Sequence, residues 1–435
     1  MEKILQLKVW SMIKLLLFFA LGAAIIGPAF FNVNIGPVSL SLFRMTLYGL
    51  WVIFVLLLLK NDGEISITNL KVRPFIWFFM IWFVYAILSL LWADSTIDAI
   101  KHINHLFVGF SLIIFVVFFF IEKGDYIRFY YLWLFVLTVL ILVGLWNVLT
   151  GQQLSVSALA NATNEQRFIP TAVFHNQNDF ATYLALSLPF TLTLIRYGRN
   201  QWVSLFGMIL SLLSLYLVFL TYSRSNYLAI AMGVAYWFFF FMTRKEKLVL
   251  IALAIAGAFI LYFLFPDLVH SVLETLKVQI DSLFVHDHGE ESVNVRTNLI
   301  KNSLLFLYDH YGFGVGAGNA EYHMAHFGVY DTAKIVNVHN WWFELLVNYG
   351  ILIFSGYVFF YIALIFLLKK QYHKLMDQNE KMIAESLLTG LVIFFLASTS
   401  PSSIIAFGPQ WLFFAFAVGY LNYLYLKDER NALAE

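Results

Sequence analysis

Three polar places in this sequence could carry chemistry, because each sets charged or hydrogen-bonding side chains among long apolar runs. The first is a tight turn that holds Ser223 and Arg224 beside further hydroxyl and amide groups, the second is Arg296, and the third is His339. A guanidinium donates paired hydrogen bonds to phosphate oxygens. An imidazole can accept a proton near neutral pH. The three places therefore suggest a site that binds an anionic group and moves a proton.

Each place also has a structural interpretation, which the residues alone leave open. Arg224 could be an interfacial residue whose head group reaches water. Arg296 lies on the apolar stripe of a helix expected over Val293–His310, and Glu321 could neutralise it there. The residues that share this stripe with Arg296 are Leu299, Ile300, Ser303 and Leu307. His339 could be a structural histidine without a catalytic role.

The composition places these residues in a membrane protein. Of the 435 residues, 61% are hydrophobic and only 12% are charged, about half the 25% that is typical of soluble proteins. The mean hydropathy of +0.78 agrees. These values exclude a soluble enzyme, a disordered chain and a small disulfide-stapled domain. Cysteine is absent, so the chain has no thiol nucleophile or thiolate metal site, and the net charge of +1 gives no reason to expect nucleic acid.

The apolar runs predict an all-α polytopic membrane protein with about twelve transmembrane helices, since about 20 apolar residues cross a bilayer. The expected spans are 13–33, 39–59, 74–93, 104–121, 129–150, 178–196, 202–221, 225–243, 247–265, 345–368, 384–400 and 407–426. Most Lys and Arg residues fall in short segments on the same side as the N-terminus. The positive-inside rule therefore places both termini in the cytoplasm. The first span is expected to be an uncleaved anchor rather than a signal peptide.

The predicted topology divides the chain into three parts. Residues 1–265 form nine spans, 266–344 a large extracytoplasmic loop, and 345–435 three further spans with a cytoplasmic tail. We expect short amphipathic helices along the membrane face over Asp267–Ile280 and over the segment that holds Arg296. All three polar places then lie at the outer face. Arg44 lies near the outer end of the second span, as an interfacial residue or as a supporting group of the site.

Two further patterns have a weaker chemical meaning. Glycines alternate along the run that contains Gly314, Gly316 and Gly318, but this run neither follows a strand nor opens a βαβ unit. We interpret it as a tight turn that lets the backbone approach the membrane or a ligand. The histidines and acids of residues 286–290 and 323–326 do not complete a ligand set, so no metal and no cofactor are predicted.

The order of these motifs resembles the O-antigen ligase and O-antigen polymerase superfamily. The resemblance rests on Ser223-Arg224, the large loop, Gly314-Val315-Gly316-Ala317-Gly318, and His339-Asn340 followed by Glu344 and Gly350. A second matching stretch is Phe174–Phe180, which contains Asn178. The match is good over residues 170–355. One departure is Asn348, where many members of the superfamily carry a second glutamate.

The resemblance implies an inverting, metal-independent glycosyltransferase that takes a glycan from a polyprenyl diphosphate. Its functional arginines and histidine correspond to Arg224, Arg296 and His339. The arginines would stabilise the diphosphate leaving group, and the histidine would deprotonate the acceptor hydroxyl or bind the diphosphate. The substrate-binding residues expected around them are Ser223, Asn178, Asn340, Glu344, Gly316, Gly318 and Arg44.

The predicted function is polymerisation of a surface polysaccharide of the capsule, exopolysaccharide, O-antigen or teichuronic-acid type. A ligase that hands the glycan to a lipid or protein acceptor is the alternative. A transporter of lipid-linked glycans is a further alternative, disfavoured because the spans carry almost no midplane charge and no internal repeat. The expected partners are a polyprenyl-diphosphate-linked oligosaccharide, a glycan or lipid acceptor, the bilayer of the cytoplasmic membrane, and other polysaccharide-assembly membrane proteins, with no nucleic acid.

Overall fold

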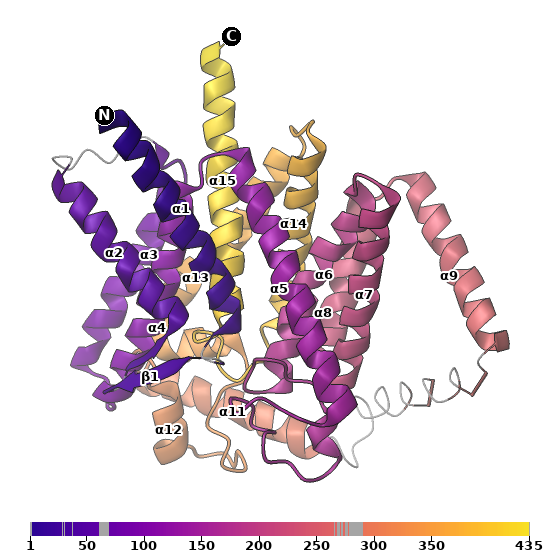
Figure 1. Ribbon diagram of the computed structural model, residues 1–435. Coiled ribbons are helices and arrows are strands. Elements are labelled where there is room, and N and C mark those ends of the chain that lie inside the picture. The colour runs from indigo at the N-terminus through magenta and orange to yellow at the C-terminus, as the bar shows by residue number, and fades with distance from the viewer. Residues whose placement is uncertain are drawn as a thin grey trace.

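The computed structural model describes residues 2–27, 31–36, 38–60, 69–264 and 290–434, with a few isolated residues between these ranges. It is a bundle of long helices, with α9 standing apart from the others and with two further helices, α11 and α12, across one end (Figure 1). The long helices are α1 Glu2–Ile26, α2 Leu42–Lys60, α3 Arg73–Leu88, α4 Thr96–Phe119, α5 Lys123–Thr150, α6 Gln177–Tyr197, α7 Gln201–Leu220, α8 Arg224–Phe240, α9 Arg244–Leu264, α13 Trp341–Tyr372, α14 Gln378–Ala397 and α15 Gly408–Ala434. The remaining elements are β1 Asn32–Ile35, β2 Val38–Ser41, η2 Ser89–Leu91, η3 Glu165–Phe168, α11 Glu290–Asp309 and α12 Ala320–Phe327.

Each apolar run of the sequence falls on one of these long helices. In the described part of the chain, six helices are long and apolar enough to cross a membrane: α3 with η2, α4, α5, α7, α9 and α13. The chain is therefore a helical membrane protein, as predicted. The number of twelve spans stays a prediction, because α1 and α2 have shorter apolar stretches and the others do not meet the same criterion.

The predicted end of the first span and the predicted start of the second, at residue 39, are both wrong. The first apolar run was expected to remain helical to residue 33, but α1 ends at Ile26, and a β-hairpin follows in which Asn32 pairs with Ser41 and Ile35 with Val38. Gly27 has a φ of +60°, the left-handed conformation that commonly ends helices. The residues after it include β-branched side chains, which favour an extended backbone. Over the described residues, the fold is thus all-α except for this antiparallel pair.

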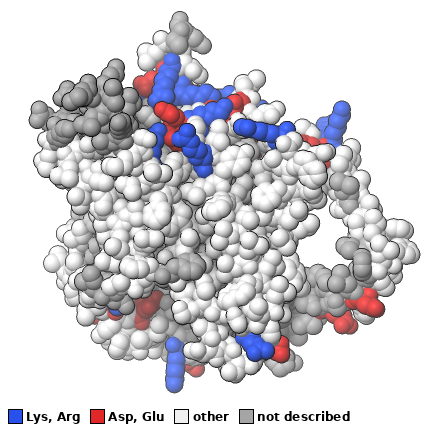
Figure 2. Space-filling model, in the orientation of Figure 1, with Lys and Arg blue, Asp and Glu red and all other residues white. Residues whose placement is uncertain are grey.

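The two ends of the bundle differ in charge. Both termini lie at one end, which we call the terminal end, and α11 and α12 lie at the other, which we call the loop end (Figure 1). Figure 2 shows Lys and Arg side chains gathered at the terminal end of the visible face. Successive long helices run in opposite directions, so α2, α4, α6, α8, α13 and α15 begin at the loop end. This charge distribution agrees with cytoplasmic termini, which remain a prediction.

A small apolar core fixes α11 to the loop end. Leu299 and Phe306 of α11 are buried with Met324 of α12 and Val347 of α13. The helix predicted over Val293–His310 is therefore confirmed, with bounds Glu290–Asp309. The helix expected over Asp267–Ile280 lies largely outside the described residues.

Candidate active site at the loop end

Three helices begin around one polar linker at the loop end. We call this linker, residues 398–403 between α14 and α15, the serine linker, because it reads Ser-Thr-Ser-Pro-Ser-Ser. At the start of α8, Ser223 Oγ lies 2.8 Å from Ser400 Oγ. At the start of α6, Asn176 Nδ2 donates to Ser402 Oγ at 3.0 Å. The backbone N–H of Trp341, at the start of α13, donates to the carbonyl of Ser398 at 3.1 Å. The serine linker thus joins the segments that hold the predicted site residues.

Buried hydrogen bonds of Ser223 hold the turn that precedes Arg224. The chain turns at Tyr222, whose φ is +56°, and α8 then starts at Arg224. Ser223 is buried and also accepts a hydrogen bond of 3.0 Å from Asn226 Nδ2. The Arg224 side chain is half-buried at the first helical position. The hydroxyl predicted to bind substrate is therefore engaged in fixing the turn that presents this arginine.

His339 lies directly before the cap of α13. Its backbone has a φ of +50°, which is uncommon for a residue with a side chain. Asn340 caps the helix, because its Oδ1 accepts from the N–H groups of Trp342 at 3.1 Å and Phe343 at 3.4 Å. The imidazole of His339 is half-buried, and its Nδ1 has no hydrogen-bond partner in the described part of the chain. Asn340 thus holds the backbone, while the neighbouring ring stays available.

Arg296 differs from its predicted setting. Leu299 and Ser303 on its stripe are buried as expected, but the Arg296 side chain itself is exposed at the beginning of that stripe. Glu321, the alternative partner, instead accepts a hydrogen bond of 2.5 Å from Asn337 Nδ2. No ion pair joins Arg296 to Glu321 among the described residues. The structural interpretation of Arg296 as half of a buried pair is therefore wrong.

The electrostatic effects link the two arginines and the histidine. Desolvation lowers the pKa of Arg296, and the like charge of Arg224 lowers it further. Desolvation also lowers the pKa of His339, followed by the positive charge of Arg296, while the backbone of Ser400 and Pro401 acts in the opposite direction. Arg296 of α11 thus lies within electrostatic reach of Arg224 of α8 and of His339 before α13. His339 is neutral at pH 7, as a proton acceptor must be.

Glu344 anchors the serine linker from α13. The side chain is 7% exposed, and its two oxygens accept hydrogen bonds from Ser403 Oγ at 2.7 Å and from the Ile404 N–H at 3.2 Å. One turn later, Asn348 donates to the Glu344 carbonyl at 2.9 Å and accepts from the Ala320 N–H at 3.0 Å. Asn348 therefore has a structural role at the position where the superfamily resemblance led us to consider a carboxylate.

The glycine run packs against other segments of the chain. Gly316 donates its N–H to the carbonyl of Asn348 at 3.1 Å. Gly318 has a φ of +66°, and a Cβ there would lie 2.7 Å from the carbonyl oxygen of Asp98. The run is a tight turn, as predicted, but the close approach is to α4 and α13 of the protein. Both glycines thereby set the position of the loop relative to Glu344.

Comparison with known proteins agrees with this arrangement. Residues 209–358, which contain Arg224, Arg296 and His339, match a family model described as O-antigen ligase. The chain is also 34% identical, over 410 residues, to the teichuronic acid biosynthesis protein TuaE of Bacillus subtilis (strain 168), and this match covers 94% of the chain and 84% of the relative. The chain belongs to the O-antigen ligase family. Members of this family are glycosyltransferase-like enzymes of surface-polysaccharide biosynthesis.

Two of the predicted site residues, Arg44 and Asn178, have no contact with Arg224, Arg296 or His339 among the interactions of the described residues. Arg44 donates to Ser39 and, at 3.0 Å, to Nδ1 of His105, so it contacts the hairpin and α4. Asn178 lies in the first turn of α6, half-buried, and its side chain makes no hydrogen bond within the described residues. Asn176, two residues earlier, is instead the residue that bonds to the serine linker. Among the described residues, no group of three His, Asp or Glu side chains could hold a metal ion.

Sequence reasoning missed the serine linker and His102. The linker has a recognisable signal, since five hydroxyl residues within six positions follow directly on an apolar span. His102 gave no signal, because a single histidine in an apolar helix is usually structural. Only the fold brings His102 Nε2 to 3.7 Å from Glu344 Oε1.

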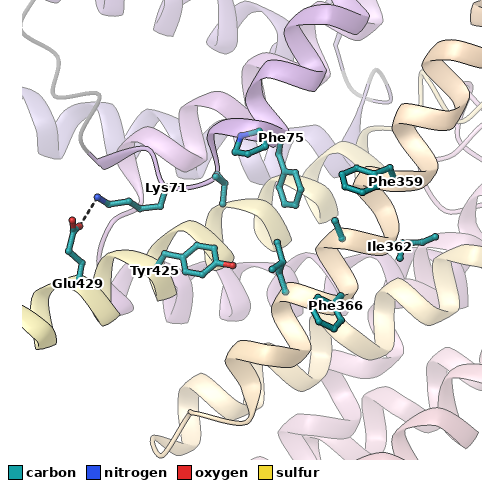
Figure 3. A pocket seen from close by; sticks show the side chains of 11 residues that line it. Lys71, Phe75, Phe359, Ile362, Phe366, Tyr425 and Glu429 are labelled. Atoms are coloured by element: carbon teal, nitrogen blue, oxygen red, sulfur yellow. Dashed lines mark ion pairs between the residues drawn. The ribbon is translucent and has the colours of Figure 1, made fainter.

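An apolar cavity lies at the opposite end of the bundle from this site. It has a volume of about 830 Å³, is lined mainly by apolar side chains of α3, α13 and α15, and opens beside the ion pair of Lys71 with Glu429 at 2.7 Å (Figure 3). Lys71 precedes α3 and Glu429 is near the end of α15, so this cavity is at the terminal end. Apolar walls such as Phe75, Phe359 and Phe366 supply no group for acid–base or phosphate chemistry. The polar residues of the loop end therefore remain the candidate active site.

Proposed function

We propose that this protein transfers an oligosaccharide from a polyprenyl diphosphate to a hydroxyl of an acceptor sugar, and so polymerises a surface polysaccharide of the teichuronic-acid type. The observation that carries the proposal is the serine linker, which joins the segments of Arg224 and His339. Its Ser400 Oγ lies 2.8 Å from Ser223 Oγ, next to Arg224, and its Ser398 carbonyl accepts from the N–H of Trp341, two residues after His339, while Arg296 lies within electrostatic reach of both. The name of the relative, a teichuronic acid biosynthesis protein, supports the polysaccharide class. The positive-inside rule would place the loop end outside the cell, at the outer face of the cytoplasmic membrane.

The two arginines would act on the donor. The bond that breaks joins an anomeric carbon to a phosphate oxygen, and the diphosphate leaves with the bonding electrons. Positive charge beside the leaving group stabilises the transition state in which negative charge grows. Arg224 is the first residue of α8, and Arg296 is on α11. They would hold the diphosphate while the polyprenyl chain stays in the bilayer. No metal is needed if both guanidinium groups supply this charge.

His339 would act on the acceptor. Its lowered pKa keeps the ring neutral, so a ring nitrogen can accept the proton of the attacking hydroxyl. The hydroxyl oxygen then forms the new bond to the anomeric carbon as the bond to the phosphate oxygen breaks. A single displacement of this kind inverts the configuration at that carbon. A product that keeps the configuration of the donor would contradict this mechanism.

A ligase that transfers the finished glycan to a lipid or protein is the second candidate. The description of the family model favours it. Both reactions use the same donor chemistry and differ only in the acceptor. The experiment therefore has to follow the product and not only the loss of donor.

The test uses the purified full-length protein with a short lipid-linked oligosaccharide, with and without chelator, and separates products by size on a gel. We expect a ladder of longer glycans from the wild type in both conditions. Arg224→Ala, Arg296→Ala and His339→Asn should each reduce the rate about 100-fold or more, since one lost transition-state donor costs about 2.7–4 kcal/mol. The matched control is Arg167→Ala, because Arg167 is exposed at the loop end and stacks only on Phe168. Equal rates in all variants, or loss of the ladder in chelator, would contradict the proposal.

A further inference from the structure

A cavity with several charged side chains in its walls lies next to the segment that holds His339. It has a volume of about 220 Å³ and is enclosed by the start of α4, the glycine run with α12, the start of α13 and the serine linker. Val338, the chain neighbour of His339, lines it. At about 30 Å³ per molecule the space corresponds to about seven waters, which suits a single sugar ring and not a lipid chain.

The walls of this cavity are acidic. Asp98, Glu321 and Glu344 line it, with Lys101 as the cation. Lys101 Nζ forms an ion pair with Asp98 Oδ1 at 2.9 Å, so Lys101 does not neutralise Glu321 or Glu344. Desolvation, and then the charge of Glu344, raise the pKa of Glu321, so the two carboxylates share the cavity. Carboxylates accept hydrogen bonds from sugar hydroxyls, while a second anion beside them would be repelled.

One ring nitrogen of His102 makes no hydrogen bond within the described residues. His102 is 9% exposed, and its Nδ1 lies 2.8 Å from the hydroxyl of Tyr349, which fixes the ring. Its Nε2 then lies 3.7 Å from Glu344 Oε1, beyond hydrogen-bond distance. This nitrogen is not fully enclosed by protein, and His102 lines the cavity, so Nε2 can form a hydrogen bond with a hydroxyl of a ligand there.

We propose that this cavity binds the terminal sugar of the acceptor, and that in a polymer of the teichuronic-acid type this terminal sugar is an uncharged sugar of the repeat and not the uronic acid. The inference rests on the transferase function proposed above and adds the acceptor subsite to it. Glu321 and Glu344 would accept hydrogen bonds from the sugar hydroxyls, and His102 Nε2 would bond to a ring substituent. The two substrates would then be separated by charge, with the anionic donor on the arginine side of His339 and the acceptor on the carboxylate side.

The first experiment detects binding without requiring transfer. Full-length protein in nanodiscs is irradiated with diazirine-bearing glucosyl, galactosyl and N-acetylglucosaminyl probes and with a glucuronyl probe, and the labelled peptides are mapped. We expect at least one uncharged probe to label peptides that contain His102 or Glu321, at least tenfold more than the glucuronyl probe does. Labelling without any turnover would support the subsite even if the proposed transfer reaction failed. Absence of labelling in this cavity by all uncharged probes would overturn the inference.

The second experiment changes the charge at the mouth of the cavity. Glu321→Lys should raise the acceptor KM about tenfold for an uncharged terminal sugar, reduce the discrimination against a glucuronyl-terminated acceptor to under threefold, and leave the donor KM unchanged. Glu321 is exposed, so the substitution is compatible with folding. The control is Glu165→Lys, which makes the same charge change at an exposed position of η3 outside the cavity. A Glu321→Lys enzyme that alters the donor KM alone, or keeps the wild-type acceptor preference, would overturn the inference.

Discussion

The variant His339→Asn distinguishes two possible roles of His339 in the proposed site, as the proton acceptor and as a ligand of the diphosphate. The substitution removes the base and keeps the backbone conformation, because Asn tolerates the left-handed region that His339 occupies at a φ of +50°. It also removes no hydrogen bond of Nδ1, which has no partner within the described residues. The substitution can weaken only the interactions of the ring with the backbone of Ser400 and Pro401, so a thermal melt of the variant is needed to separate a loss of stability from a loss of chemistry.

The expected loss follows from the role of a general base. Proton transfer by a positioned base contributes about 10²–10⁴-fold, and a factor of ten corresponds to about 1.36 kcal/mol, so kcat should fall by the equivalent of about 2.7–5.5 kcal/mol. The donor KM should stay within a factor of about three. A large rise in donor KM with kcat unchanged would refute the base and make His339 a ligand of the diphosphate.

The pH profile supplies the decisive control. The base works in its neutral form, and the pKa of His339 is lowered by desolvation and by Arg296. The acid limb of the wild-type rate should therefore have its midpoint below pH 6.5, the usual histidine value. Arg296→Gln removes one cause of the lowered pKa, so the residual activity of that variant should decline at higher pH than in the wild type. An acid limb that persists unchanged in His339→Asn would show that another group titrates.

Two further predictions concern the supports of the site. Asn340→Ala should lower stability by about 1 kcal/mol, the usual cost of a lost N-cap, and should also reduce kcat. The control is Asn200→Ala, which removes the cap of α7 at the terminal end. This variant should lower the thermal midpoint and leave kcat intact. Gly318→Ala should cost about 1–3 kcal/mol, because its Cβ would meet the Asp98 carbonyl from a strained backbone. Gly257→Ala in α9 is the control, with no atom within 4 Å of the added carbon, and should be neutral or stabilising in the same detergent melting assay. Equal midpoints for Gly318→Ala and the wild type would contradict the packing argument.

The sequence was sufficient for the features that depend on local composition. Apolar length located the long helices, since a segment of α5 or α13 has to be apolar along its whole length to lie in a membrane. Rare polar residues among such segments are costly unless they have a function, and this selected Arg224, Arg296 and His339 before any contact was known. The same reasoning failed where two local preferences compete, as at Gly27, where a turn and a hairpin replace the end of the expected first span.

The contacts that complete the site could not be predicted, because they join segments far apart in the chain. Ser400 lies 2.8 Å from Ser223 across 177 positions, and His102 meets Tyr349 across 247 positions. No periodicity or motif encodes such pairs. Helical spacing also gave the correct stripe for Arg296 but not its exposure, since burial at the end of a stripe depends on where the neighbouring helices stop.

The alternation of helix directions has an electrical consequence. Six long helices, α2, α4, α6, α8, α13 and α15, begin at the loop end, while α1, α3, α5, α7, α9 and α14 end there. Each helix dipole places about half a positive charge at its start and about half a negative charge at its end, so the dipoles largely cancel over the loop end as a whole. Around the serine linker the balance is uneven, because α6, α8 and α13 begin beside it and α14 ends there. Backbone atoms would therefore add positive potential beside the proposed diphosphate site without adding Lys or Arg residues, on which the positive-inside rule depends.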